Sequence, residues 1–269
     1  HILNVKHAVD RVISNGGASG IDGMQIDNLR DYLNTNWKTL RSDILSGTYR
    51  PQAVRKVEIP KASGGKRMLG IPTVIDRVIQ QSISQWLGLK YEGDFHDNSY
   101  GFRPNRNAHQ AVSKAQEYLN LGYTWVVELD LEQFFDQVNH DKLMHLLSKK
   151  IMDRRVLALI GKYLRCGIMD HGLEQKRTKG TPQGSPLSPL LSNIILHELD
   201  TELSSRGHRF VRYADDCSIY TKSNKSATRI MRNITSYIES TLKLKVNREK
   251  SKVSRPSQSN LLGFSFFKS

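Results

Sequence analysis

The stretch Arg209-Phe-Val-Arg-Tyr-Ala-Asp-Asp-Cys-Ser-Ile-Tyr-Thr221 decides the fold of this chain. Two short apolar and aromatic runs, about 209–213 and 217–221, lie on either side of Ala214-Asp-Asp216. Runs joined so tightly predict a β-hairpin with two carboxylates in its bend. Asp is also common in turns for conformational reasons alone, so a purely structural role for Asp215 and Asp216 stays open.

The segments around this hairpin predict the rest of its sheet. Residues 124–131 form a short apolar strand that ends in an acid, Asp130, and helical spacing follows over 186–204 and 225–242. Short strands are expected near 244–247 and 261–266. Strand, helices, hairpin, helix and strand is the order of a split βαβ antiparallel sheet with helices on one face, which is an α+β fold.

In such a sheet the first strand and the hairpin are neighbours, so Asp130 and Asp215 are expected at one edge although they lie far apart in the chain. Carboxylates without basic partners repel one another and raise each other's pKa. They stay ionised when they hold a divalent metal, and hard oxygen ligands favour Mg²⁺. Two such ions can activate an attacking hydroxyl and stabilise a leaving pyrophosphate.

The N-terminal half carries a second hairpin with a basic rim. Apolar residues alternate over 53–71 around the turn Ser63-Gly-Gly65. Lys61 and Arg67 fall on its facing strands, where they can clamp a triphosphate. A solvated hairpin rim is the other reading of these cations.

The composition indicates a polyanionic partner. The chain has 269 residues, with 40 Lys and Arg against 26 Asp and Glu, a formal net charge of +14. Nucleic acid is the first candidate for such an excess. Hydrophobic residues make up 38% of the chain, which excludes disorder as its main state. No apolar run approaches the ~20 residues of a membrane span. We expect a soluble protein of a reducing cytoplasm, bacterial or organellar, and an excised piece, because His1 opens inside a helical pattern.

Three long motifs occur in order along the chain. They are Glu128-Leu-Asp-Leu-Glu-Gln-Phe-Phe-Asp136, Gly180-Thr-Pro-Gln-Gly-Ser-Pro-Leu-Ser-Pro189 and Tyr213-Ala-Asp-Asp216. With them the sequence resembles the reverse transcriptases of group II introns, which are polymerase/maturase proteins. Nearly the whole chain shares the resemblance, through Gly20-Ile-Asp-Gly23, Ile59-Pro-Lys61, Leu69-Gly-Ile-Pro72, Ser99-Tyr-Gly-Phe-Arg-Pro104, Asn247 to Lys250 and Leu262-Gly-Phe264.

The resemblance implies a right-hand polymerase with fingers and palm and without a thumb. Residues 1–105 and 142–182 are then expected to form the fingers, including the extension with the Gly20–Gly23 motif. Residues 106–141 and 183–269 are expected to form the palm with the catalytic carboxylates.

The resemblance also implies the catalytic residues. Asp130 and Asp215 would be ligands of two Mg²⁺ ions, for which Mn²⁺ can substitute, with Asp216 beside them and the Leu131 backbone carbonyl as a further ligand. The reaction would be attack of a primer 3′-hydroxyl on the α-phosphate of a deoxynucleoside triphosphate (dNTP), with release of pyrophosphate.

Further residues are expected to bind the nucleotide. The family places the aromatic ring that excludes a ribose 2′-hydroxyl at Phe135; Phe134 is its rival, and either ring can belong to the core. Gln183 precedes Gly184, where a missing side chain lets the backbone approach the nucleotide. Lys250 matches a family lysine near the nucleotide, although a basic loop explains it as well.

Template and primer contacts are expected from five residues. Arg103 can bind a template phosphate and Tyr100 can stack on a base. Tyr213, Leu262 and Gly263 lie within the shared motifs. An ordinary surface charge and a loop packed on the core remain the alternatives for Arg103 and Tyr100.

The expected function is RNA-dependent DNA polymerisation on an RNA template and primer, with intron RNA bound through a maturase role of the full-length protein. An alternative is an RNA-binding splicing cofactor with little polymerase activity. RNA-templated RNA synthesis is disfavoured by the bulky Phe135. Self-association as a homodimer is not readable from the sequence, nor is the distinction between an intron enzyme and a defence-associated relative.

Overall fold

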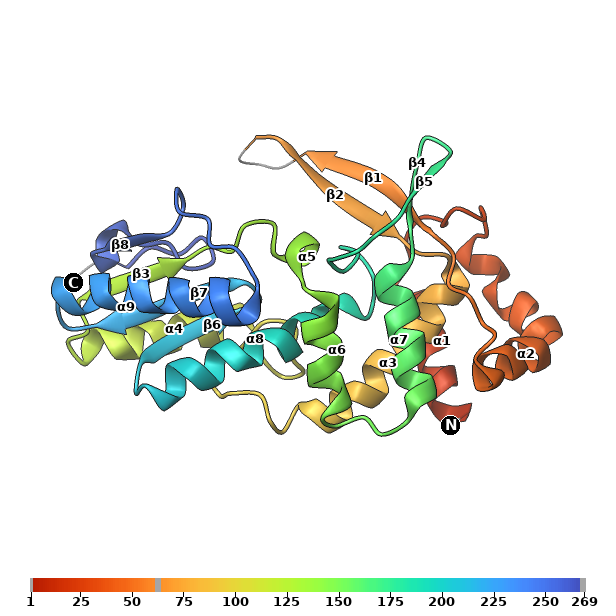
Figure 1. Ribbon diagram of the computed structural model, residues 1–269, viewed down its shortest axis with the longest axis horizontal. Helices are drawn as coiled ribbons and strands as arrows, with labels where there is room; N and C mark the ends of the chain where they lie inside the picture. Colours follow the sequence, from red (N-terminus) through yellow and green to blue (C-terminus); the bar gives the residue numbers. More distant parts are fainter. Residues whose placement is uncertain (1, 61–63, 267–269) are drawn as a thin grey trace. The chain divides into compact units, whose positions relative to one another are not determined.

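The chain divides into two compact units (Figure 1). A computed structural model describes residues 2–60 and 64–266. The first unit comprises residues 1–90 and 140–190, and the second comprises 91–139 and 191–269. Ser99, which bridges in parallel to Arg212, thus lies in the second unit, and the fingers and palm boundaries expected at 105 and 106 stay a prediction. Each unit has its own four-stranded sheet.

The first unit surrounds a sheet of order β2-β1-β4-β5. Its elements are α1 (Ile2–Asn15), η1 (Ile26–Asn28), α2 (Leu29–Ser46), β1 (Val54–Pro60), β2 (Lys66–Ile71), α3 (Val74–Tyr91), α6 (His140–Ser148), α7 (Arg154–Arg165), β4 (Ile168–Asp170) and β5 (Leu173–Gln175). The expected hairpin is present as β1 and β2, whose antiparallel register pairs Ile59 with Arg67. Sequence patterning missed β4 and β5, because three-residue strands are too short to show alternation.

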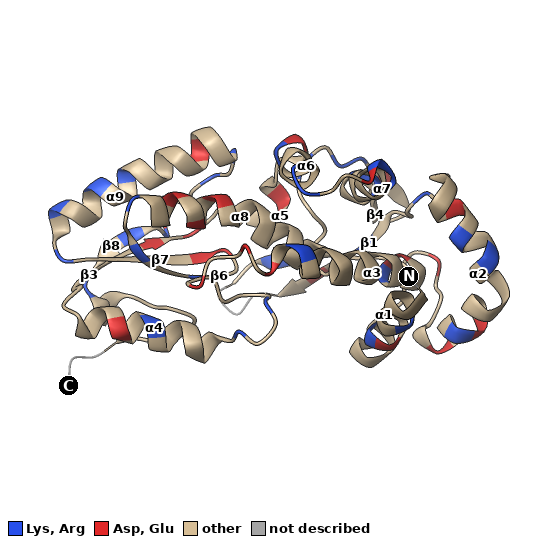
Figure 2. Cartoon of the chain, turned by 90° about the horizontal axis from the view of Figure 1, so that it is seen from below, with Lys and Arg blue, Asp and Glu red and all other residues tan. Residues whose placement is uncertain are grey.

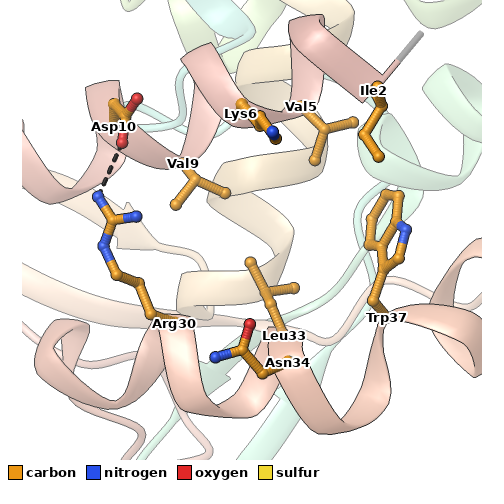
Figure 3. A pocket seen from close by; sticks show the side chains of 9 residues that line it. All are labelled: Ile2, Val5, Lys6, Val9, Asp10, Arg30, Leu33, Asn34 and Trp37. Atoms are coloured by element: carbon orange, nitrogen blue, oxygen red, sulfur yellow. Dashed lines mark hydrogen bonds and ion pairs between the residues drawn. The ribbon is translucent and has the colours of Figure 1, made fainter.

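An open groove lies between α1 and α2 of this unit (Figure 3). It has a volume of about 580 Å³, and Val5, Val9, Leu33 and Trp37 are among the side chains that line it. An ion pair of 2.8 Å between Arg30 and Asp10 crosses it. None of the residues expected at the catalytic or nucleotide site lines this groove.

The second unit is built on an antiparallel sheet of order β6-β7-β3-β8. Its elements are α4 (Ala108–Asn120), β3 (Trp125–Leu129), α5 (Phe134–Gln137), α8 (Ser188–Ser205, which begins just before the boundary), β6 (Arg209–Tyr213), β7 (Asp216–Thr221), α9 (Asn224–Tyr237), η2 (Ile238–Leu242), β8 (Lys252–Ser254) and η3 (Pro256–Gln258). The edge strand is β8, whereas the expected strands near 244–247 and 261–266 form only isolated bridges.

Helices cover both faces of this sheet, which corrects the expectation of helices on one face (Figure 2). Val126 packs in one cluster with Ala111, Ala115 and Tyr118 of α4. The next residue, Val127, is fully buried and points to the opposite face because side chains alternate along a strand. On that opposite face Arg212 of β6 binds Asp200 of α8. Both faces are therefore packed, and the alternation of apolar and polar residues in β3 is weak.

No helix within residues 2–60 and 64–266 is long and apolar enough to cross a membrane.

Candidate active site

The pairing of β3 with β7 brings two acidic segments to one end of the second sheet. Leu129 pairs with Cys217 in this antiparallel ladder. One residue further, the same register places Asp130 opposite Asp216. Directly opposed residues share a face of the sheet, and so do residues two apart in a strand. Glu128, Asp130 and Asp216 therefore lie on the same face.

A two-residue loop presents Asp215 between the strands of the hairpin. Tyr213 pairs with Asp216, so only Ala214 and Asp215 connect β6 to β7. Ala214 has φ 55°, a left-handed conformation that glycine usually supplies at the first position of such a loop. Asp215 is partly exposed beside the buried Ala214. The loop is thus tight, and the acid at its tip is open to a ligand.

The electrostatics of the site show that the acids affect one another. The pKa of Asp216 is raised to about 6, first because the carboxyl is buried and then because Asp215, Glu128 and Asp130 repel its charge. A hydrogen bond from the Leu262 backbone works in the opposite direction. This region therefore favours a bound cation or a bound proton.

Glu128 has a structural task that the sequence did not reveal. Its carboxylate accepts hydrogen bonds from the Ser254 hydroxyl at 3.1 Å and from the Asn260 backbone at 2.9 Å. It also forms an ion pair of 3.5 Å with Lys252. Glu128 thus anchors the C-terminal segment beside the acidic end of the sheet. In the sequence, the only sign of this role is that Glu128 lies two residues before Asp130 and so shares its strand face.

The backbone of Asp130 is tied to the loop that carries Lys250. The Asp130 amide donates to Ser251 Oγ at 3.0 Å, and its carbonyl accepts from the Asn247 amide at 2.9 Å. The next residue, Leu131, is buried and forms an isolated bridge with Val246. Lys250 itself is exposed, and its amide donates to Asn247 Oδ1 at 3.3 Å. The lysine loop is therefore anchored to the strand end that carries Asp130.

The two neighbouring phenylalanines differ in accessibility. Phe134 is buried with 3% of its surface exposed, whereas Phe135 is only partly buried. Their rings meet edge to face, with centroids 5.3 Å apart. Phe134 thus belongs to the core and supports Phe135 from the side, which leaves Phe135 as the ring that a ligand can reach.

A second tight turn lies near the acids. Leu261 and Phe264 exchange two backbone hydrogen bonds around Leu262 and Gly263, which have φ 55° and 86°. Gly263 is exposed, and Leu262 is half-buried against the α4 cluster, as is Tyr213. Through the bond from Leu262 to Asp216, this turn is fastened to the acidic hairpin.

Two of the residues expected to contact a template are engaged inside the second unit. Tyr100 is 6% exposed and belongs to the cluster beneath α4. The Arg103 side chain is 4% exposed and donates to Glu92 at 2.9 Å and to the carbonyls of His96 and Ser99 at 2.7 and 2.8 Å. These contacts favour the core reading of both side chains over a template contact.

The expected nucleotide residues of the first unit are placed in part. Lys61 lies outside the described residues, and Arg67 is exposed on β2. The Gln183 carbonyl accepts a hydrogen bond of 2.8 Å from the Gly70 amide, which fastens its loop to β2. Gly184 has φ 100°, and an added Cβ would come no closer than 3.6 Å to the Gly70 carbonyl. Glycine is therefore required at position 184 because of its positive φ, and not because a side chain would lack space.

The acids of the second unit fit Mg²⁺ by the chemistry of their donors. Within the described part of the chain, no three His, Cys, Asp or Glu side chains converge as a closed metal cage. Mg²⁺ is typically held by one or two carboxylates and by the phosphates of its substrate. Asp130 and Asp215, with only oxygen donors, suit that arrangement.

Comparison with known proteins identifies relatives of this chain. The family model described as reverse transcriptase (RNA-dependent DNA polymerase) matches residues 59–266. Protein YkfC of Escherichia coli K12 is 34% identical over 272 residues, which cover 87% of this chain and 71% of YkfC. The group II intron-encoded protein LtrA of Lactococcus lactis is 40% identical over 194 residues, which cover 72% of this chain and 32% of LtrA. The chain thus spans about a third of LtrA.

Solved structures share the fold at low sequence identity. A telomerase of Candida albicans superposes with a TM-score of 0.61 at 16% identity, over 85% of this chain and 49% of the telomerase chain. A telomerase of Candida tropicalis gives 0.60 at 14% identity, over 85% and 47%.

The raised pKa of Asp216 makes stability depend on pH. Because the folded state favours the protonated carboxyl, the stability that this group contributes is lost as the pH rises through about 6. In metal-free buffer, Asp216→Asn should raise the Tm at pH 7.5 by about 2–4 °C, the effect of about 1 kcal/mol in a domain of this size. The gain should shrink toward pH 5. Thermal unfolding with EDTA measures both.

Asp27→Asn is the matched control, since Asp27 is exposed in η1. It should leave the Tm unchanged at both pH values. If the Tm of wild type and of Asp216→Asn changed with pH in the same way, the result would contradict a buried carboxylate with a raised pKa at this position.

Proposed function

The chain belongs to the reverse transcriptase family, and from this membership we propose that it is the polymerase part of a group II intron protein that copies RNA into DNA. The observation that carries the proposal is the pairing of β3 with β7, which puts Asp130, Asp215 and Asp216 at one end of the second sheet. We assign the second unit as the palm and the first as the fingers.

In this proposal the palm acids hold two divalent cations. Asp130 and Asp215 would contribute carboxylate oxygens, and the Leu131 carbonyl would add a backbone ligand. When bound, Mg²⁺, or Mn²⁺ in its place, would supply positive charge that stabilises the reacting phosphate oxygens. Asp216 stays beside them and adjusts the charge of the site through its own proton.

The reaction exchanges one phosphorus–oxygen bond for another. The 3′-oxygen of the primer bonds to the α-phosphorus of a dNTP, and the bond from that phosphorus to the β-phosphate's bridging oxygen breaks. Pyrophosphate leaves, and the hydroxyl proton passes to water. Positioning of the two substrates and stabilisation of charge carry most of the catalysis in phosphoryl transfer.

The remaining residues are proposed to select and hold the substrates. Lys61, Arg67 and Lys250 would bind the triphosphate, and Gln183 and Gly184 would present backbone to the nucleotide. The accessible ring of Phe135 would exclude a ribose 2′-hydroxyl. Leu262, Gly263 and Tyr213, which lie next to the acids, would contact the primer.

RNA binding without polymerisation is the second candidate function. The net charge of +14 favours it, because nucleic-acid affinity rises with the number of phosphates that Lys and Arg neutralise. Intron RNA would be the partner. Since the chain spans 32% of LtrA, binding and polymerisation can be distributed differently in the full-length protein.

The first prediction of the proposal separates these functions. Asp215→Asn keeps the shape of the side chain but removes its charge, so primer extension on an RNA template with Mg²⁺ should fall by about 100-fold or more. The affinity for the same primer–template, measured by fluorescence anisotropy, should stay within twofold. Asp27→Asn should change neither value. Wild-type RNA binding without any extension would favour the binding function.

The second prediction concerns sugar selection. Phe135→Val should relax the preference for dNTPs over ribonucleotides by about tenfold, which corresponds to about 1.4 kcal/mol of lost steric rejection. Single-nucleotide incorporation on an RNA template gives the ratio. Phe134→Leu is the comparison, because its ring is buried against Phe135 and should affect stability more than selection. Relaxed selection in Phe134→Leu with none in Phe135→Val would reverse the assignment.

A further inference from the structure

An ion pair is fully buried beneath the catalytic hairpin. Arg212 in β6 and Asp200 in α8 both have 0% of their side chains exposed. Arg212 Nε donates to Asp200 Oδ1 at 2.7 Å, and Nη2 donates to Oδ2 at 2.6 Å. The pair is thus bidentate, the geometry that fits a planar guanidinium best.

The other donors of Arg212 bind three more groups. Nη1 donates to the Ala214 carbonyl at 2.8 Å and to Asn193 Oδ1 at 3.1 Å. Nη2 also donates to Ser99 Oγ at 2.7 Å. All five N–H groups of the guanidinium are therefore satisfied, which no other side chain in place of arginine could achieve.

The bond to Ala214 connects this network to the proposed metal ligand. Ala214 precedes Asp215 in the two-residue loop and has φ 55°. A non-glycine residue keeps this conformation only when its surroundings hold it. Arg212 lies two residues before Ala214, and its guanidinium donates to the Ala214 carbonyl. This hydrogen bond opposes a change of the loop away from the left-handed conformation of Ala214.

The segment 98–101 pairs with β6 at Arg212 and also approaches the loop. The Arg212 amide donates to the Asn98 carbonyl, and the Tyr100 amide donates to the Arg212 carbonyl, both at 2.8 Å. Asn193 Nδ2 holds the Gly101 carbonyl at 2.9 Å. A Cβ at Gly101 would lie 2.2 Å from the Ala214 nitrogen, so only glycine allows this approach. Arg212 and Gly101 thus both contact the backbone of Ala214, and α8 holds Arg212 through Asp200 and Gly101 through Asn193.

Stability alone gives a poor reason for such a pair. Removing two charges from water opposes folding, and an apolar replacement of similar volume is often as stable. A geometric task explains it better, because a guanidinium can join an acid, an amide, a hydroxyl and a carbonyl in one fixed plane.

We propose that Arg212, held by Asp200, is a positioning residue that fixes the Ala214–Asp215 loop and so pre-forms the divalent-cation site. The proposal rests on the function proposed above for Asp215. Arg212 touches neither substrate nor metal in this scheme and acts only through the loop.

Arg212→Lys tests the proposal. Lysine keeps the charge opposite Asp200 but cannot also reach Ala214, Asn193 and Ser99. Hydrogen exchange of the peptide 211–217 should become at least tenfold faster. Mn²⁺ binding, followed by the EPR signal of free Mn²⁺, should weaken about tenfold, and the Mg²⁺ concentration for half-maximal primer extension should rise by the same factor. RNA affinity should stay within twofold.

Arg77→Lys is the matched control. Arg77 is also buried, at 8% exposure, and donates to the carbonyls of Pro72 and Gly16 in the first unit. It should lower the Tm without changing Mn²⁺ binding or exchange of peptide 211–217. A loss of stability in Arg212→Lys with unchanged Mn²⁺ binding would overturn the proposal and leave Arg212 a core residue.

Gly101→Ala gives an independent test if Arg212→Lys does not fold. It displaces Ala214 without touching the ion pair and should weaken Mn²⁺ binding in the same direction; wild-type Mn²⁺ binding in Gly101→Ala would overturn the proposal. Asp215→Asn separates the two levels of inference. Unchanged Mn²⁺ binding in Asp215→Asn would overturn both the metal site and the positioning role. If the wild type extends primers and Arg212→Lys has the same Mg²⁺ requirement for extension, only the positioning role is overturned.

Discussion

The register between β3 and β7 is the constraint on which the acidic site depends. Leu129 pairs with Cys217, so the continuation of this register brings Asp130 toward Asp216. A slip of one residue would turn every side chain of β3 to the other face of the sheet. Such a slip would exchange Val126, packed beneath α4, with Val127, fully buried on the other side. Core packing on both faces thus holds Asp130 on the face of Asp216.

Holding several acids together opposes folding, and the surrounding contacts offset this. The charge on Asp216 is disfavoured by burial and by its neighbours. Hydrogen bonds hold the other acidic residues in place. Ser251 and Asn247 bind the backbone of Asp130, and the Glu128 carboxylate accepts from the Asn260 amide. Functional sites commonly keep such unfavourable arrangements, because the rest of the fold over-determines their geometry. A bound cation would then relieve the repulsion that the fold maintains.

Local patterns were enough for much of the fold. The β1–β2 hairpin, the helices α8 and α9, and the strand that ends before Asp130 all follow from periodicity and turn residues. The short strands β4 and β5 did not, since three residues leave no periodic signal. The expectation of helices on one face of the sheet was also wrong, because both faces of β3 are apolar and periodicity does not say which helix meets which face. The readings of Tyr100 and Arg103 stayed open for a similar reason: the letters of a motif do not distinguish a ring or cation that faces a ligand from one that supports a loop.

By itself the sequence determined the family, the acidic motifs and the residue types of the proposed chemistry, since these depend on order along the chain. Tertiary structure alone decided which side chains support other segments: Glu128 binds the backbone of Asn260, and Arg212 with Asp200 lies beneath the Ala214–Asp215 loop. The physical reason is that their partners lie in other elements. Twelve positions separate Arg212 from Asp200 and 113 separate it from Ser99, so no local pattern in the sequence could reveal those contacts.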